Sequence, residues 1–371
     1  MIYLDHAATT PLRPGVVEVM APFLDECFGN PSGAHGVSRG AKNALEEARE
    51  GAAGLLGARP MEIVFTGGGT EADNLAVVGR ALAGGSTDGV VTVATEHDAV
   101  LESARFVERL GGRVAVIGVD RYGLVEPDEI AGVVDPNTVL VSVMAANNET
   151  GTIQPIKKVV ESVKGRRPEV VVHTDAVQAF NTEPLDVDEL GVDLLSLAAH
   201  KFGGPKGVGL LYVREGTALE PVLHGGGQEL GRRSGTHNVA GVVGMVHAMA
   251  AAHADRDEFR RRVTDARNVF ESALGEWAIR TIPAQFSLPQ HSHLQFPGVN
   301  NETLLVNLDL AGVACSAASA CQSGATTVSH VLGAMGLAVD AARSSLRFSF
   351  GWNSTTEEAM QAARLIREVL P

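Results

Sequence analysis

Short apolar runs that alternate with helical patterns are the feature that most limits how this chain can fold. The runs lie at residues 62–66, 90–94, 114–117, 139–143 and 170–173. They lack the apolar–polar alternation of a half-exposed strand, so we expect strands buried on both faces. Between them, residues 38–56 carry apolar side chains at helical spacing and stop before Gly57. This order predicts an α/β domain in which a mostly parallel sheet is sandwiched by helices.

The pattern changes after about residue 254. The elements predicted there are a charged amphipathic helix over 255–277, strands over 292–296 and 345–349, and a closing helix from about Thr355. We therefore expect a large domain over residues 13–255. A smaller α+β domain is expected over residues 256–371, joined by the N-terminal residues 1–12.

Composition argues against several classes of protein. The net charge is −14 and no Lys/Arg-rich run stands out, so a general nucleic-acid surface is not expected. The uncharged run between Arg233 and Asp255 contains Asn238 and His247, which predicts a buried helix and not a membrane span. The chain shows no signal peptide, and its 3 cysteines suit a reducing cytoplasm. The histidines are scattered, so no metal site is predicted.

Two short motifs stand at the ends of successive apolar runs. Asp175 and Gln178 belong to the first motif, and His200 and Lys201 follow it. A lysine amine can form a Schiff base with the aldehyde of pyridoxal phosphate (PLP), and a carboxylate can hold a proton on the pyridine nitrogen. Gln178 can donate to the phenolic oxygen of the cofactor, and His200 can reach its phosphate. The pair therefore predicts a PLP site, against the simpler interpretation of Lys201 as a surface lysine.

Further polar residues follow other predicted strands. The glycine turn that ends in Gly69 and Thr70 stands where a strand gives way to a helix, and such a turn favours a phosphate. It has neither a GK[ST] sequence nor the G-x-G-x-x-G spacing. His97 follows a second strand and is expected to stack on the ring, while Asn148 predicts a turn or a ligand contact. Ligands of open α/β sheets bind at this edge.

Cys321 lies among small residues, in the stretch SAASACQSGA. A thiol in such surroundings is expected to be exposed and reactive, whereas Cys315 and Cys27 are interpreted as structural. Arg347 lies within a predicted strand and can bind a carboxylate through its planar fork. The alternative is an ordinary arginine of an edge strand.

These segments together resemble the NifS/IscS-type cysteine desulfurases, which are fold-type I PLP enzymes with a class V aminotransferase-like fold. The resemblance covers nearly the whole chain and is carried by YLDHAATTP, TGGGTEADNLAV, TEHDAVL, NNETGTIQPI, HTDAVQ, AHKFGGPKGVG, HGGGQELGRRSGT, SACQSG and SLRFS. It implies a homodimer that binds L-cysteine, releases L-alanine and forms a persulfide on Cys321 for an acceptor protein or thiol.

The resemblance also implies a role for each matching residue. The cofactor residues are Gly69, Thr70, His97, Asp175, Gln178, His200, Lys201 and, from the other subunit, Thr236. The catalytic residues are Lys201, His97 and the nucleophile Cys321, and those that hold the substrate carboxylate are Asn148 and Arg347. The chain departs from the family at Ala198, where many members have a serine that contacts the phosphate.

Three alternatives remain open at this point. A selenocysteine lyase or a cysteine C–S lyase would depend less on Cys321. A sulfur-relay partner with little turnover would keep the fold alone. The acceptor, the pathway and the purpose of Cys315 are not predicted, and the short C-terminal segment argues against docking on an iron–sulfur scaffold.

Overall fold

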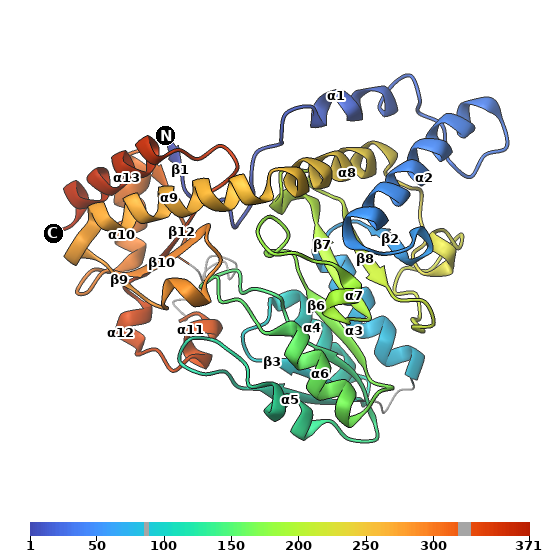
Figure 1. Ribbon diagram of the computed structural model, residues 1–371, viewed down its shortest axis with the longest axis horizontal. Helices are drawn as coiled ribbons and strands as arrows, with labels where there is room; N and C mark the ends of the chain where they lie inside the picture. Colours follow the sequence, from blue (N-terminus) through green and yellow to red (C-terminus); the bar gives the residue numbers. More distant parts are fainter. Residues whose placement is uncertain (85–88, 318–327) are drawn as a thin grey trace.

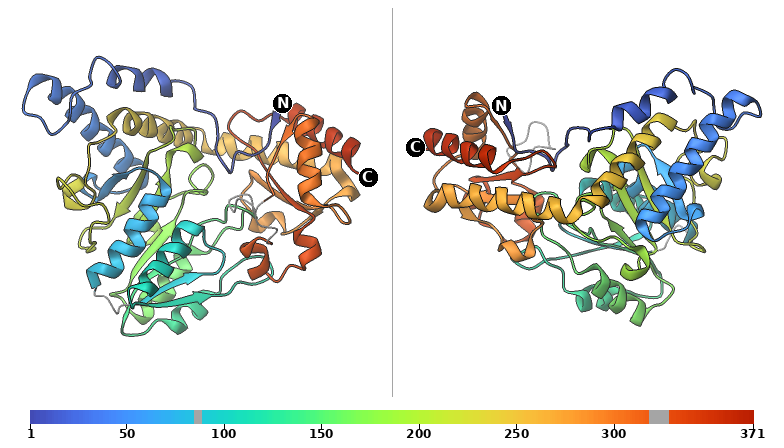
Figure 2. Two further views of the ribbon diagram at one scale, coloured as in Figure 1. Left: turned by 180° about the vertical axis from the view of Figure 1, so that it is seen from behind. Right: turned by 45° about the horizontal axis from the view of Figure 1, so that its top comes forward.

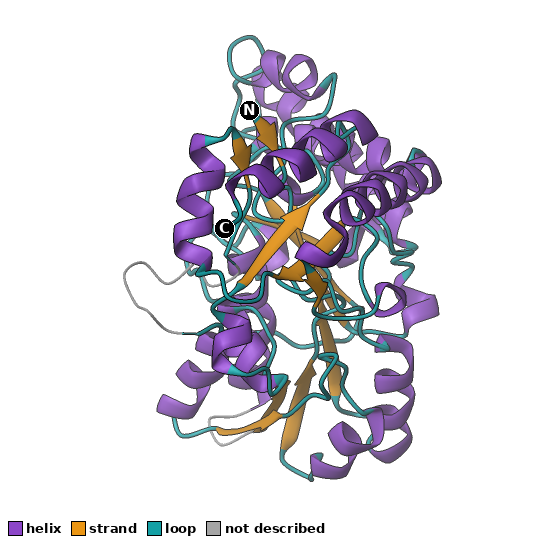
Figure 3. Cartoon of the chain, turned by 90° about the vertical axis from the view of Figure 1, so that its left-hand side faces the viewer, coloured by secondary structure: helices purple, strands orange, loops and turns teal. Residues whose placement is uncertain are grey.

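The computed structural model describes residues 1–84, 89–317 and 328–371. Its largest feature is a sheet of seven strands in the order β2-β8-β7-β6-β5-β3-β4. The strands are β2 (Ile63–Thr66), β3 (Gly89–Val93), β4 (Arg113–Ile117), β5 (Thr138–Ser142), β6 (Val171–Asp175), β7 (Leu194–Ala198) and β8 (Gly209–Val213). The run from β4 to β7 is parallel, and β8 is antiparallel to both of its neighbours. The expected mostly parallel sheet is therefore confirmed, and Figure 3 shows helices on both sides of it.

The expectation of burial on both faces is right for four of the predicted runs and wrong for β4. Val116 of β4 is 52% exposed, although β2, which ends the sheet on the other side, is buried throughout. Within the interior strands, neighbouring residues pack into different clusters: Val90 and Leu140 on one face, Val91 and Val141 on the other. Successive side chains of a strand point to opposite faces, so both faces of the sheet are covered.

Helices supply that cover (Figure 1). The large unit contains α1 (Val16–Met20), α2 (Gly36–Leu56), α3 (Gly69–Gly84), α4 (Asp98–Arg109), α5 (Pro127–Val133), α6 (Ile156–Arg166), α7 (Val187–Leu190) and α8 (Val239–Ala254). Helices α3 and α4 pack on one face of the sheet, and α2, α6 and α8 pack on the other. Among the described helices, none is long and apolar enough to cross a bilayer, and α8 is largely buried as predicted.

A second unit has its own sheet and core. Its larger sheet pairs β10 (His291–Gln295) with β12 (Ser345–Ser349) and β9 (Ile279–Arg280), all antiparallel. The helices of this unit are α9 (Arg256–Leu274), α10 (Asn301–Leu310), α11 (His330–Ala334), α12 (Val339–Ala342) and α13 (Thr356–Val369). Figure 2 shows them gathered at one end of the molecule. Helix α8 ends at Ala254 and α9 begins at Arg256, and we propose that the two domains divide there.

The N-terminal segment belongs to this second unit. Strand β1 (Ile2–Tyr3) pairs in parallel with β11 (Val313–Ala314), and Asp5 bridges to Ser349. In Figure 2 the N-terminus lies beside the orange and red elements, far from α2. The chain then crosses to the large unit, where Thr10 N donates to His200 O over 3.1 Å. Residues 5–10 therefore run between the two units.

Candidate active site

The parallel strands deliver several of the predicted residues to one edge of the sheet. Gly69 follows β2, His97 follows β3, Asp175 ends β6 and Lys201 follows β7. The carboxyl ends of parallel strands meet at the same edge, so these residues converge there. Asp175 lies within electrostatic reach of both His97 and Lys201. The structure thus brings the carboxylate, the lysine and the histidine together.

Asp175 is buried at the end of its strand. One carboxylate oxygen accepts a hydrogen bond from Val177 N over 2.9 Å. Burial raises the pKa of the Asp175 carboxyl, and its electrostatic interactions with His97 and Lys201 act in the opposite direction. A carboxylate in such surroundings gains most from a fixed cationic partner beside it.

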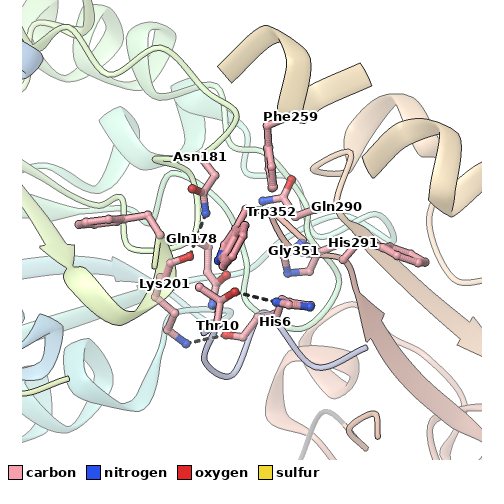
Figure 4. A pocket seen from close by; sticks show the side chains of 13 residues that line it. His6, Thr10, Gln178, Asn181, Lys201, Phe259, Gln290, His291, Gly351 and Trp352 are labelled. Atoms are coloured by element: carbon pink, nitrogen blue, oxygen red, sulfur yellow. Dashed lines mark hydrogen bonds between the residues drawn. The ribbon is translucent and has the colours of Figure 1, made fainter. Parts of the chain in front are cut away.

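Lys201 is anchored against the N-terminal segment. Its Nζ donates to Ala7 O over 2.6 Å and to Ala8 O over 3.1 Å, and Gln178 Nε2 donates to the same Ala7 O over 2.9 Å (Figure 4). Asn181 Nδ2 donates to Lys201 O over 2.8 Å. The main chain and the amine of Lys201 are therefore both held in place.

A small cavity lies beside Lys201, between the two units. Its lining includes His6, Gln178, Phe259, His291 and Trp352 (Figure 4). A volume of about 20 Å³ gives room for one water molecule and not for an aromatic cofactor. Asp175 and His97 are not part of its lining.

His97 is the N-cap of α4, and its Nδ1 accepts a hydrogen bond from Ala99 N over 3.1 Å. Because Nδ1 accepts, a neutral His97 carries its proton on Nε2. His200 is close to Thr9, and burial together with the charges of Lys201 and Lys206 lowers the pKa of His200 to about 4. His200 is therefore a neutral hydrogen-bonding group at neutral pH.

The glycine turn packs tightly against the strands beside it. A Cβ on Gly69 would lie 3.0 Å from Val177 Cγ2 and 3.3 Å from Ala198 Cβ, so a larger residue would crowd the turn. Helix α3 begins at Gly69. Thr70 therefore lies inside the first turn of α3, and its side chain is exposed.

Arg347 is buried and doubly held, unlike an ordinary edge arginine. Its Nη1 donates to Asn148 O over 2.8 Å, and its Nη2 pairs with Asp5 Oδ1 at 2.6 Å. The Nε atom is buried without a hydrogen-bond partner among the described residues. The structure thus places Arg347 beside Asn148, and adds Asp5, which sequence reasoning missed.

Two predicted residues stand apart from this cluster. Thr236 is exposed in the loop before α8, and no side-chain hydrogen bond is found for it within the described part of the chain. Cys321 lies outside the described residues. The described residues on either side of it attach at the site: Ser316 exchanges two main-chain hydrogen bonds with Arg347, and Ser329 Oγ donates to Glu149 Oε2 over 2.5 Å. Burial raises the pKa of Cys315, which keeps it a thiol.

A buried polar layer behind Asp175 was also missed. His173 lies between Ser142 Oγ, 2.8 Å from its Nδ1, and Ser196 Oγ, 2.9 Å from its Nε2. Burial lowers the pKa of His173 to about 3, so it is neutral. Asp73 Oδ1 lies 3.7 Å from Nε2, and burial raises the pKa of Asp73. The one available signal was the two-residue spacing of His173 and Asp175, which places both on one face of β6.

Comparisons with known proteins agree with this fold. The model of the aminotransferase class-V family matches residues 2–361, and the chain belongs to that family. A protein of Dictyoglomus turgidum (strain DSM 6724 / Z-1310), named cysteine desulfurase IscS, is 44% identical over 100% of this chain and 94% of its own length.

Two solved structures are similar as well. One, described as a NifS-like protein, matches with a TM-score of 0.93 and 38% identity over 99% of this chain and 98% of its own. The other, described as SspA in complex with cysteine, matches with a TM-score of 0.84 and 35% identity over 94% and 99% of the two chains.

The residues present fit the PLP on which this family depends. Asp175 is a buried carboxylate that would face the pyridine nitrogen, and Lys201 would supply the amine. Gly69 leaves open a place that a Cβ would fill, at the start of a helix. Backbone N–H groups at the start of a helix attract a phosphate.

Proposed function

We propose that the chain is a PLP-dependent cysteine desulfurase that converts L-cysteine to L-alanine and leaves the sulfur as a persulfide on Cys321. The observation that carries the proposal is the buried guanidinium of Arg347, which donates to the main chain of Asn148 on the side of the large sheet where Lys201 lies. Ser316 and Ser329, the described residues on either side of Cys321, bond to Arg347 and Glu149. Relatives that match the full length of the chain carry the name cysteine desulfurase.

The roles follow from position. Lys201 would hold the cofactor, Asp175 would face its ring nitrogen and Gln178 its phenolic oxygen, with His97 over the ring. The phosphate would lie against Gly69, Thr70, His200 and Thr236 of the partner subunit. When bound, PLP supplies an electron sink that makes the substrate α-proton acidic. The Lys201 amine is placed to take that proton, and Arg347 with Asn148 would orient the carboxylate.

Sulfur leaves through a balanced displacement. The Cys321 thiolate attacks the substrate sulfur, so a sulfur–sulfur bond forms while the carbon–sulfur bond breaks. The electron pair of the broken bond stays with the carbon fragment, which gains protons and leaves as alanine. A thiol of the acceptor then takes the outer sulfur by exchange.

We further propose a homodimer located in the cytoplasm. Large apolar side chains near the first helix support an interface, because Val17, Leu24 and Phe28 are all more than half exposed. The small number of cysteines supports a reducing compartment. The name IscS among the relatives supports, as one destination of the sulfur, an acceptor in iron–sulfur cluster assembly.

Mass spectrometry after incubation with L-cysteine tests the proposal. We expect an added sulfur on Cys321, none on Cys315, and alanine as the product. A Cys321→Ser variant should keep the cofactor and lose sulfide release in the presence of a reductant, while Cys27→Ser serves as the matched control. Near-normal turnover by Cys321→Ser would assign the chain to the lyases, and absence of turnover in the wild type would favour a sulfur-relay protein.

The cofactor has its own test. We expect the PLP-loaded protein to absorb visible light and the Lys201→Ala variant to lose that band. An unchanged band in Lys201→Ala would show that another group holds the cofactor.

A further inference from the structure

We propose that Asp5 is a resident carboxylate that competes with the carboxylate of an amino-acid ligand for Arg347 and so weakens ligand binding. The inference rests on the proposed function, because it takes Arg347 as the anchor of the substrate carboxylate. It adds Asp5 as a residue that sets the affinity of the site.

The hydrogen-bond geometry of Arg347 is the first argument. A guanidinium takes a carboxylate bidentately through one of two edges, Nε with Nη2 or Nη1 with Nη2. Both edges include Nη2, and Asp5 Oδ1 already lies 2.6 Å from Nη2. Asn148 O occupies Nη1, while Nε is buried without a partner among the described residues. An incoming carboxylate must therefore share Nη2 with Asp5 or displace it.

Charge is the second argument. The side chain of Arg347 is 7% exposed and that of Asp5 is 20% exposed, so the pair lies in a site where water screens poorly. A second carboxylate on the same guanidinium meets the negative charge of Asp5 at short range, and like charges in such a site oppose each other. Loss of that charge leaves Arg347 with its full attraction for the ligand.

The main chain of Asp5 is held independently of its carboxylate. Asp5 bridges to Ser349, and its carbonyl oxygen accepts a hydrogen bond from the Tyr3 hydroxyl over 3.0 Å. An Asp5→Asn substitution keeps an oxygen that can accept from Arg347 Nη2 and removes only the charge. This makes Asp5→Asn a clean probe of competition.

Calorimetric titration of the PLP-loaded enzyme with L-alanine, and with L-alaninamide, which lacks the carboxylate, tests the inference. We expect Asp5→Asn to bind L-alanine about three- to tenfold more tightly than the wild type and L-alaninamide within about twofold. Asp340→Asn, an exposed carboxylate of the same unit, is the matched control and should change neither constant. Unchanged or weaker binding of L-alanine by Asp5→Asn overturns the inference.

An Arg347→Lys variant separates this inference from the proposed function. We expect it to bind L-alanine at least tenfold more weakly. Unchanged binding would remove Arg347 from the substrate site and overturn both ideas, whereas weaker binding without tightening in Asp5→Asn overturns the inference alone.

Thermal unfolding gives a second readout. Without ligand, Asp5→Asn should unfold at a lower temperature than the wild type, because a buried guanidinium has lost its counter-ion. Saturating L-alanine should raise its midpoint by more than it raises that of the wild type. An equal or smaller rise contradicts competition. Should Asp5→Asn not fold, Asp5→Ser provides the same comparison.

Discussion

The buried carboxylate of Glu229 gives the sharpest prediction for stability. Glu229 lies in the short 3-10 helix Glu229–Gly231 and accepts hydrogen bonds from both terminal nitrogens of Arg49, each over 2.8 Å. Phe65 N, 3.0 Å away, and His237 Nε2, 2.8 Å away, complete its partners. These partners together lower the pKa of Glu229 from 4.5 to about 2 against the effect of burial. The carboxylate therefore ties the loop that carries Thr236 to α2 and β2.

The contribution of Glu229 to the free energy of unfolding follows from its lowered pKa. A fall from 4.5 to about 2 corresponds to about 3 kcal/mol of stability at pH 7. The folded pKa lies below the unfolded one, so this stability is complete above pH 4.5 and is lost as the pH falls through 2. This value agrees with the cost of about 3–5 kcal/mol for removing one partner of a buried ion pair.

Thermal unfolding of Glu229→Gln checks the magnitude. For a chain of 371 residues, 3 kcal/mol corresponds to a midpoint lowered by about 4 °C at pH 7. Glu46→Gln is the matched control, because Glu46 contacts the same Arg49 at 3.4 Å but its side chain is 50% exposed, so we expect a loss below about 1 °C. Equal losses in the two variants, or a Glu229→Gln gap that does not narrow between pH 5 and pH 3, would refute the reasoning.

Two further predictions concern Glu149 and Gly209. Burial raises the pKa of Glu149 from 4.5 to about 7, so the folded state binds this proton more tightly than the unfolded state does. The resulting contribution to stability is complete below pH 4.5 and is lost as the pH rises through 7. Glu149→Gln should match the wild type in denaturant unfolding at pH 4 and exceed it by up to about 3 kcal/mol at pH 8; no gain at pH 8 contradicts this. A Cβ on Gly209 would lie 2.6 Å from Leu197 O and 2.7 Å from the carbonyl carbon of Gly68, both main-chain atoms. Gly209→Ala should cost about 1–3 kcal/mol and weaken PLP binding in a fluorescence titration, because it pushes on the glycine turn. Gly54→Ala, where an added Cβ on α2 meets no other atom, should instead stabilise the protein by about 0.5–1 kcal/mol. Equal changes in stability for Gly209→Ala and Gly54→Ala would contradict this prediction.

The sequence predicts β3, β5 and β6 to within two residues, because burial on both faces requires continuous apolar runs. It does not predict the place of a strand in the sheet. β4 has the same local pattern as β3, yet Val116 of β4 is exposed while β3 is buried throughout. β8 was not predicted as a strand, and its insertion beside β7 depends on long-range pairing.

Some residues of the candidate site can likewise be predicted from the sequence, and others cannot. Asp175, His97 and Lys201 are predictable because each follows a strand, and the carboxyl ends of parallel strands share one edge. Asp5 and Asp73 are not predictable, because their partners are supplied by β12 and β6, which lie far along the chain. Local pattern carries no information about such contacts.

The N-terminal segment has a consequence for how the protein is made. Residues 5–10 leave the ribosome long before Arg347 and Ser349, yet Asp5 pairs with Arg347 and bridges to Ser349. At about 5–20 residues per second, the interval between them is on the order of tens of seconds. From its own synthesis until that of β12, Lys201 lies at a sheet edge that still lacks Arg347. The Arg347 guanidinium thus joins this edge only after all seven strands of the large sheet have been synthesised.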